Sequence, residues 1–412
     1  MIIEGNFYAY LRCDILRILM MTPDYPPNLY GGIGTHVYNL ATGFVNEGNS
    51  VTVLVAKINR HSDDPNNFEV SENGKLTVIN FPTTMDGDFS NEIDPHFSKT
   101  RIATPFKWAE LSNKLFPMVY RFLKSVDPFD VFHAHDSFHA FTSVAIKDLF
   151  NIPMVTTIHS ISAPPNHFND SLRRYMLNNS NKAIVVSKWL NEEIGTRYGE
   201  LATDVHVIPN GIDYDSCEDS FRRACNPQFQ PLSITFCGRL SPLKGCDVLL
   251  KAFAILKRSN SSFNYKLKIA GDGPLKNELK LLSESLSIDK DVEFLGFLKN
   301  NEVKLLLRQS SLHVIPSIEE SFGITALEAI AEGIPVIASQ TGGLSEIIEN
   351  GVNGIVFPLG NSEILANEMD KLLNNPYTRS QLAKQALKRI EKYSWDNIVI
   401  ETNNIYNMII ND

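Results

Sequence analysis

Short hydrophobic segments rich in β-branched residues recur along the whole chain, and segments with helical character separate them. Strands of this kind that alternate with helices are typical of parallel sheets covered by helices on both faces. The segments form two successive series, so the sequence predicts two doubly wound α/β domains. The predicted strands are 17–21, 51–55, 130–133, 154–158, 183–186 and 205–208, followed by 232–236, 265–269, 292–294, 312–315, 335–338 and 354–357.

The length of 412 residues accommodates two such domains. We expect residues 15–212 to form the first domain and residues 232–394 the second. The stretch 213–231, which is rich in Asp, Ser and Arg and has no apolar period, is expected to link them. Residues 1–14 are interpreted as an N-terminal extension. Residues 395–412 are helical in character and are expected to cross back to the first domain.

Composition disfavours several classes of protein. The net charge of −9 argues against a non-specific nucleic-acid binder. The five cysteines include no Cys-x-x-Cys pair, which argues against a disulfide framework or a zinc ribbon and favours a cytoplasmic location. The amphipathic, basic stretch 97–126 is compatible with contact to a membrane surface. A solvated helix packed on the sheet is the favoured interpretation, because Pro117 weakens a continuous membrane-lying helix.

Ligands of parallel sheets bind beyond the carboxyl ends of the strands, and the unusual residues of this chain follow those ends. After the first strand, Gly31, Gly32 and Gly34 open a helix. Glycine permits close approach of a ligand there, and the free N–H groups at a helix start favour an anion. A glycine turn formed only for packing is the alternative.

Histidines follow two further strands of the first half. His133, His135 and Asp136 lie at the end of the third strand with His139 close behind, and His159 ends the fourth strand. Such a set is compatible with a metal site, but the usual metallo-β-lactamase-like pattern has one residue between the second His and the Asp. A structural cluster with one or two side chains lining a cleft is therefore favoured, and no metal is assigned. For His159, an ordinary buried histidine is the alternative.

Charged residues follow the strands of the second half. Arg239 and Lys244 lie in a loop stiffened by Gly and Pro, where their cations can converge on a diphosphate. A solvated basic loop is the alternative. Glu320 and Glu328 follow the strand 312–315, and Glu328 lies among apolar neighbours in the next helix. A carboxylate in that setting needs a partner, which the vicinal hydroxyls of a ribose would supply. The same helix starts with Gly323, Ile324 and Thr325. Their backbone N–H groups would donate hydrogen bonds to an anion or a sugar oxygen.

Taken together, these motifs resemble those of the family 4 retaining glycosyltransferases, which have the GT-B fold of two Rossmann-like domains facing across a cleft. The glycogen-synthase-like and small-acceptor branches are the most similar. The resemblance spans about residues 15–410. The matching stretches are 30–36, 133–136, 207–213, 238–245, 271–274, 320–328 and 341–346.

The resemblance implies a hexosyltransferase that moves a hexose or N-acetylhexosamine from a nucleotide diphosphate sugar, expected to be UDP-linked, to a hydroxyl acceptor. Arg239 and Lys244 would neutralise the diphosphate in place of a metal, so no cofactor is expected. Glu328 would bind the ribose and Glu320 the transferred sugar. The implied catalytic residues are His159, Asp136, Glu320, Arg239 and Lys244. The further residues implied in donor binding are Gly31, Gly32, Gly34, Phe322, Gly323, Ile324, Thr325 and Glu328.

Three other functions stay open at this point. A nucleotide-sugar epimerase on the same scaffold would convert the donor without an acceptor. A metallohydrolase would use His133, His135 and His139. A non-catalytic sugar-binding protein would have a decayed site, against which the complete set of cations and glutamates argues. The identity of the acceptor is not carried over from the resemblance.

Overall fold

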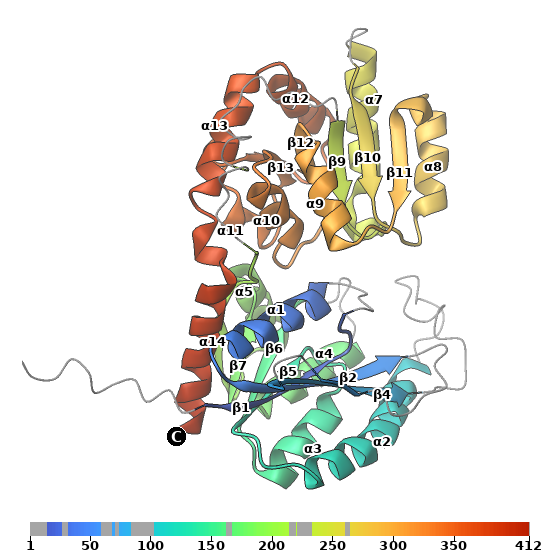
Figure 1. Ribbon diagram of the computed structural model, residues 1–412. Helices are drawn as coiled ribbons and strands as arrows, with labels where there is room; N and C mark the ends of the chain where they lie inside the picture. Colours follow the sequence, from blue (N-terminus) through green and yellow to red (C-terminus); the bar gives the residue numbers. More distant parts are fainter. Residues whose placement is uncertain are drawn as a thin grey trace, which may run out of the picture.

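The computed structural model describes residues 15–26, 32–58, 68–70, 74–83, 103–161, 167–213, 220, 233–259 and 264–411. Two helix-covered sheets form two domains, and the chain passes between them along one side of the molecule (Figure 1). The predicted pair of α/β domains is therefore confirmed.

The first sheet has eight strands, all parallel except the edge strand β3. In spatial order the strands are β3 (Phe68–Val70), β4 (Leu76–Thr83), β2 (Ser50–Ile58), β1 (Arg17–Thr22), β5 (Val131–His135), β6 (Met154–Ile158), β7 (Lys182–Val185) and β8 (Asp204–Val207). The helices of this domain are α1 (Gly32–Asn46), α2 (Ala103–Lys124), α3 (Ala140–Phe150), α4 (His167–Asn178) and α5 (Lys188–Tyr198). All six predicted strands are present, and β3 and β4 are additional.

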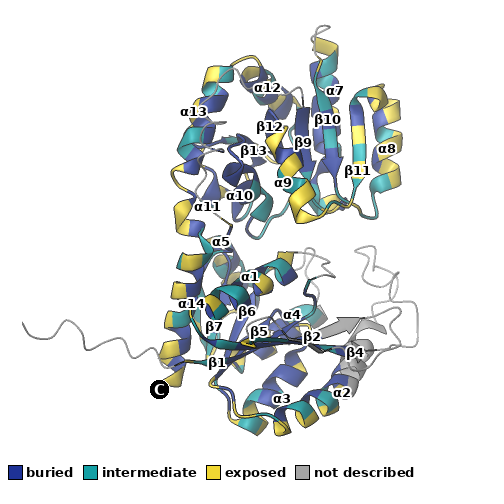
Figure 2. Ribbon diagram, viewed as in Figure 1, coloured by how far each residue is buried: buried dark blue, intermediate teal, exposed yellow. Residues whose placement is uncertain are grey.

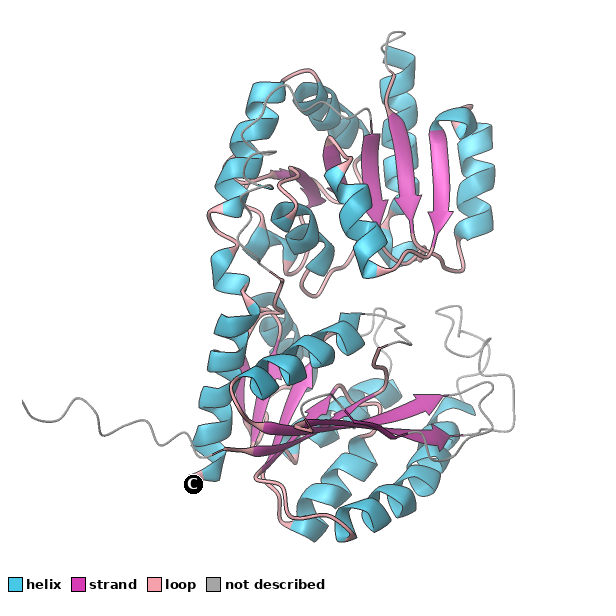
Figure 3. Ribbon diagram, in the orientation of Figure 1, coloured by secondary structure: helices cyan, strands magenta, loops and turns pink. Residues whose placement is uncertain are grey.

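The second sheet has six parallel strands, all of them predicted. In spatial order they are β11 (Val292–Gly296), β10 (Lys266–Ala270), β9 (Ser233–Cys237), β12 (Leu312–Ile315), β13 (Val336–Ser339) and β14 (Ile355–Phe357). Figure 2 shows that the central strands β9, β12 and β13 are buried whereas the edge strand β11 is partly exposed, and Figure 3 shows the helices around the sheet. The helical elements are η2 (Pro242–Lys244), α7 (Cys246–Ser259), α8 (Lys276–Ser285), η3 (Asp289–Asp291), α9 (Asn300–Arg308), α10 (Ile324–Ala331), α11 (Leu344–Ile347), α12 (Ser362–Leu373), α13 (Pro376–Leu387), η4 (Glu391–Tyr393) and α14 (Trp395–Ile410).

The two domains are held together by one apolar cluster and a set of polar contacts. The cluster contains buried side chains from both domains, such as Ile161 and Leu190 from the first and Phe322 from the second. Glu346 of the second domain caps helix α5 of the first, since its carboxylate accepts hydrogen bonds from the backbone N–H groups of Lys188 (3.1 Å) and Trp189 (2.9 Å). A carboxylate is stabilising at that end of a helix because the dipole is positive there.

The basic helix α2 packs on the first sheet. Leu115, Val119 and Leu123 are buried in the same apolar cluster as strand residues of that sheet. The helix continues through Pro117 without a break. Among the residues that the structure describes, no helix is both long enough and apolar enough to cross a bilayer.

Helix α14 lies along the first domain although it follows the second in the chain (Figure 1). Tyr406 is fully buried there, and its ring stacks on Phe44 with centroids 5.1 Å apart. Its hydroxyl lies 2.7 Å from Nδ1 of His133, whose Nε2 lies 2.7 Å from the hydroxyl of Thr157. These contacts anchor the end of the chain on strands β5 and β6.

We expect Tyr406→Phe to lower the free energy of unfolding by about 1–3 kcal/mol, because it leaves a buried nitrogen of His133 without a partner. Urea unfolding followed by circular dichroism measures this change. Tyr377→Phe is the matched control, since Tyr377 is 66% exposed. Equal stability of the two variants would show that the buried hydrogen bond does not anchor α14.

Candidate active site

The order of the strands locates the ligand-binding edge of each sheet. In the first sheet the chain leaves β1 toward β2 and later returns to β5 on the other side of β1. In the second sheet β9 and β12 flank the corresponding reversal. Ligands of open parallel sheets bind outside the carboxyl ends of the strands at such a reversal. Most of the predicted site residues follow β1, β5, β9 or β12.

Two glycines allow the loops after β9, β12 and β13 to pack against one another. Gly245 has φ +60°, and a Cβ at this position would overlap the backbone oxygen of Pro316. Gly342 has φ +50°, and a Cβ there would overlap the backbone oxygen of Glu320. No other residue type fits such close backbone contacts at positive φ. The loops that present Lys244 and Glu320 are thereby held side by side.

Lys244 and Glu320 form an ion pair, with Nζ 2.6 Å from Oε2. Ser317 also donates a hydrogen bond to Oε2 of Glu320, over 3.3 Å. Lys244 lies in η2 after β9, and Glu320 lies in the loop after β12. The packing of these loops therefore brings together the residue expected to bind the donor diphosphate and the residue expected to bind the transferred sugar.

Arg239 and Glu328 complete the charged groups of the second domain. Arg239 is exposed, and its guanidinium has no hydrogen-bonding or ionic partner within the described part of the chain. The carboxylate of Glu328 likewise accepts no side-chain hydrogen bond from the described residues. Burial raises the pKa of Glu328 to about 7, and the positive charge of Lys304 offsets part of that rise. Both groups are available to a ligand.

The start of helix α10 faces the start of helix α1 across the domain contact. A Cβ on Gly32 would lie 2.9 Å from Cδ1 of Ile324, so the two helix starts approach closely. Gly323 caps α10 with φ 107°. The backbone N–H groups of Gly323, Ile324 and Thr325 make no hydrogen bond to the described residues. Two helix N-termini at one place favour a negatively charged ligand between them.

Three other residues implied in donor binding lie in or beside these helix starts. Gly34 is buried in the first turn of α1, whereas Gly31 lies outside the described residues. Phe322 is buried, and its ring packs edge-on against Tyr393 with centroids 5.9 Å apart. The aromatic side chain of Phe322 therefore supports the loop from within the core.

His159 follows β6 and lies beside two further histidines. Its Nε2 is 3.2 Å from Nδ1 of His135, and its ring meets that of His36 edge-on with centroids 4.7 Å apart. Burial lowers the pKa of His36 to about 4, and burial together with neighbouring imidazoles holds the pKa values of His135 and His159 well below the usual range. All three rings are neutral at pH 7.

Asp136 follows β5 directly and adopts left-handed backbone geometry, with φ 61°. Its buried carboxylate lies 3.7 Å from Nε of Arg173 and accepts hydrogen bonds from the backbone N–H groups of Ser137 and His159. Burial raises its pKa, and the charge of Arg173 opposes that rise. Asp136 thus fixes the backbone that carries His159.

The predicted alternative of a metal bound by His133, His135 and His139 has no geometric support. Both ring nitrogens of His133 are occupied, by Tyr406 and Thr157. His139 is buried, has no partner for either nitrogen among the described residues, and does not belong to the group that His135 forms. His135 instead groups with His36 and His159.

Two residues without a predicted role also shape this region. Asn210 is one of them: its side chain raises the pKa values of His36 and His159, against the larger lowering caused by burial. The neighbouring Gly211 leaves room for the indole of Trp395, which also packs against His36 with ring centroids 5.3 Å apart. Asn210 lies in the motif stretch 207–213, so the sequence pointed to this segment. Nothing in the motif indicated that Asn210 influences the histidines.

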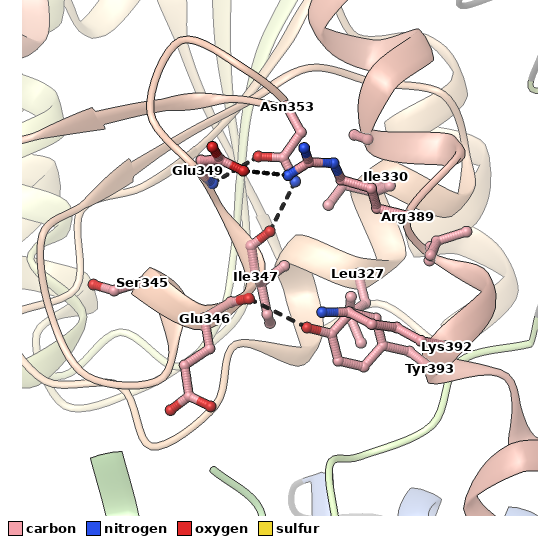
Figure 4. Close-up of a pocket in the computed structure, with 12 residues that line it drawn as sticks. Leu327, Ile330, Ser345, Glu346, Ile347, Glu349, Asn353, Arg389, Lys392 and Tyr393 are labelled. Atoms are coloured by element: carbon pink, nitrogen blue, oxygen red, sulfur yellow. Dashed lines mark hydrogen bonds and ion pairs between the residues drawn. The ribbon is translucent and has the colours of Figure 1, made fainter. Parts of the chain in front are cut away.

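A separate cavity of about 330 Å³ lies between α10, α11, α13 and η4 (Figure 4). Two of its charged lining residues, Arg389 and Glu349, form an ion pair. Asn353 donates a hydrogen bond to the backbone oxygen of Ile347 over 2.9 Å. None of the predicted site residues lines this cavity, so it is not part of the candidate active site.

Comparison with known proteins covers nearly the whole chain. The family profile "Glycosyltransferase Family 4" matches residues 30–216, and "Glycosyl transferases group 1" matches residues 219–389. An uncharacterized glycosyltransferase of Methanocaldococcus jannaschii is 34% identical over 95% of this chain and 98% of its own length. A glycogen synthase of Mycobacterium tuberculosis is 28% identical over 95% of this chain and 94% of its own length.

Solved structures share the same architecture. HepE of Anabaena, in complex with UDP and glucose, superimposes with a TM-score of 0.71, covering 95% of this chain and 100% of that chain, at 20% sequence identity. At that level of identity the match supports the two-domain fold alone.

Proposed function

Since this chain belongs to the family 4 glycosyltransferases and is a glycosyl-transferring enzyme, we propose that it transfers a hexose or N-acetylhexosamine from a UDP-linked donor to a hydroxyl acceptor. The observation that carries this proposal is the set of groups that follow β9 and β12: the ion pair of Lys244 with Glu320, the cation Arg239, the carboxylate Glu328 and the N-terminus of α10. The donor class is consistent with the UDP bound by HepE.

The diphosphate of the donor is assigned to Arg239 and Lys244. Arg239 offers a planar guanidinium with no competing partner among the described residues, and guanidinium binds phosphate oxygens in a bidentate manner. Lys244 is held by Glu320 in this structure. An arriving diphosphate would share the ammonium and release the Glu320 carboxylate toward the hydroxyls of the sugar. No metal ion takes part in this proposal.

The reaction would need orientation and charge stabilisation more than a nucleophile. As the glycosidic bond breaks, negative charge grows on the diphosphate, and the two cations together with the free N–H groups of α10 would stabilise it. The acceptor oxygen would attack the same face of the sugar, with retention of configuration. His159 and Asp136 are assigned to the first-domain side of the sugar, Asp136 acting through the backbone of His159.

Donor affinity is expected to rise with pH between 6 and 8. Glu328 must be ionised to accept hydrogen bonds from two ribose hydroxyls, and its pKa in the free enzyme is about 7. The ionised fraction, and with it the association constant, should increase by about tenfold from pH 6 to pH 8. Calorimetry with an intact UDP-sugar measures this, because its esterified diphosphate does not titrate in that range. The affinity of Glu328→Gln should be independent of pH; a matching slope in that variant would assign the titration to another group.

Thermal-shift screening against nucleotide sugars tests the donor, since a ligand that binds only the folded state raises Tm. Product analysis then separates the proposal from its alternative. A glycosyltransferase consumes donor in proportion to glycosylated acceptor, whereas an epimerase converts the donor sugar with no acceptor present. Stoichiometric epimerised donor in the absence of acceptor would overturn the proposed reaction.

A further inference from the structure

Arg173 is a buried cation on helix α4 that lies beside Asp136. The residue is 7% exposed, and its Nε lies 3.7 Å from Oδ1 of Asp136, whose side chain is only 2% exposed. That distance is too long for a hydrogen bond, and Nε has no hydrogen-bonding partner among the described residues. The two residues therefore form a buried ion pair, and the reaction proposed above gives Arg173 no part.

A second carboxylate holds the other end of the guanidinium. Nη1 of Arg173 lies 3.5 Å from Oδ1 of Asp170, one turn earlier in α4. The same oxygen accepts a hydrogen bond from the hydroxyl of Tyr198 on helix α5, over 2.9 Å. The guanidinium is thereby fixed at the place where α4, α5 and the end of β5 meet.

The place of this ion pair in the fold points to a role beyond stability. Transferring two charges from water into a protein can cost as much as their attraction returns, so a buried ion pair is weak evidence for stabilisation. Asp136 begins the loop at the ligand-binding end of β5 and has φ 61°, an uncommon backbone conformation for a residue other than glycine. Strained conformations of this kind cluster at functional sites. Arg173 therefore pairs with a residue at the ligand-binding edge of the sheet.

We propose that Arg173 is a positioning residue for glycosyl transfer, whose positive charge holds the carboxylate of Asp136 ionised and in place on the first-domain side of the sugar. Arg173 itself touches neither donor nor acceptor in this proposal. The inference rests on the proposed function, which assigns Asp136 to that side. Without the guanidinium, burial would favour the neutral carboxyl group, and a neutral carboxyl group is a weaker hydrogen-bond acceptor than a carboxylate.

The aromatic groups around the ion pair stay neutral between pH 6 and pH 9. Burial raises the pKa of Tyr198 to about 12. Burial is also the largest cause that lowers the pKa values of the three histidines at or after the ends of β5 and β6, which are His135, His139 and His159. Among the described residues, the charged groups at this place are Asp136, Arg173 and Asp170. Burial raises the pKa of Asp136 and Arg173 opposes that rise, so removing the guanidinium should move the ionisation of Asp136 to higher pH.

The test is the pH dependence of kcat for Arg173→Gln at a saturating concentration of UDP-sugar. Saturation removes the titration of Glu328 in the free enzyme from the profile, because kcat reports the groups of the enzyme–substrate complex. We expect the acid limb of kcat to move to higher pH by about 1–3 pH units, the effect of one opposite charge within about 4–6 Å, while KM for the donor changes little. Arg173→Lys should restore the limb in part, because it keeps a positive charge. An acid limb that stays at the wild-type pH in both variants would overturn the inference.

Two control variants make this result specific. Arg379→Gln removes another buried guanidinium, which is 4% exposed and donates to the backbone oxygens of Leu372 and Leu373 in the second domain. It should leave the acid limb at the wild-type pH, whatever it does to stability. Asp170→Asn removes the second carboxylate and should not move the limb to higher pH. An equal shift in either variant would show that the loss of a buried charged group, and not the pairing with Asp136, causes it.

Urea unfolding in the absence of substrate separates this inference from the proposed reaction. Because the pKa of Asp136 is raised in the folded protein, the folded state binds more protons than the unfolded chain between the two pKa values, so stability falls as the pH rises through that range. The free energy of unfolding of Arg173→Gln should therefore fall further between pH 5 and pH 8 than that of the wild type, and Arg379→Gln should follow the wild type. Equal falls would overturn the hold of Arg173 on Asp136, whereas a wild type that transfers no sugar would refute the proposed function. If Arg173→Gln does not fold, Arg173→Lys should show both shifts in the same direction and at smaller size.

Discussion

Arg239→Ala is expected to lower kcat/KM for glycosyl transfer by about 10²–10³-fold, the loss typical of removing one preorganised group that stabilises transition-state charge. Arg239 is exposed and has no partner among the described residues, so its removal breaks no internal contact and should leave Tm unchanged. Steady-state kinetics with a UDP-sugar, beside a thermal melt, separates the two effects. Arg239→Lys should restore only part of the activity, because an ammonium lacks the planar fork.

The control for Arg239→Ala is Lys371→Ala. Lys371 is also a surface cation, and its ion pair with Glu368 lies within helix α12. This variant should keep wild-type kinetics. If Arg239→Ala also kept them, the diphosphate would not be held by the loop after β9, and the assignment of the donor site would fail.

Gly245→Ala is expected to give the largest loss of stability among the loop variants. The residue has φ +60°, and the added methyl group would overlap the backbone oxygen of Pro316, which has no flexible side chain to move away. Strained backbone conformations cost about 1–3 kcal/mol each, and the overlap adds to that cost. Since the loop carrying Lys244 must shift, donor affinity should fall together with the free energy of unfolding.

The variant Gly351→Ala separates the cost of a positive φ angle from the cost of steric overlap with a neighbouring loop. Gly351 has φ +74°, but nothing lies within 4 Å of the position of its Cβ. It should therefore show the cost of positive φ alone. Urea unfolding and UDP-sugar calorimetry on both variants give the difference. Equal losses of stability would mean that the contact between the loops after β9 and β12 is not tightly packed.

The strands of the fold could be predicted because a strand buried on both faces is a continuous apolar run. All twelve predicted strands are present. Strand β4 was not predicted because Thr77 and Asn80 interrupt its apolar residues. Strand β3 has only three residues and pairs at the sheet edge, so its sequence gives little periodic signal.

The charged groups of the site could be predicted because their motifs lie after predicted strands, but their pairing could not. Lys244 and Glu320 are far apart in the sequence, and only the order of β9 and β12 in the sheet brings them together. The same holds for the histidines. His135 pairs in register with Thr157, which sets His159 beside it, whereas His36 reaches the group from a helix whose packing no local pattern specifies.

Two stretches of chain run side by side where they pass from one domain to the other. At the contact, the N–H of Ile212 donates to the backbone oxygen of Tyr393 over 2.8 Å, and Ile212 forms a β-bridge with Ser394. A single strand would let the domains swivel freely, whereas a hydrogen-bonded pair resists twisting and leaves bending as the easier motion. Such a pair would guide any opening and closing of the molecule along one arc, so the loops after β1 and β9 would return to the same alignment at each turnover.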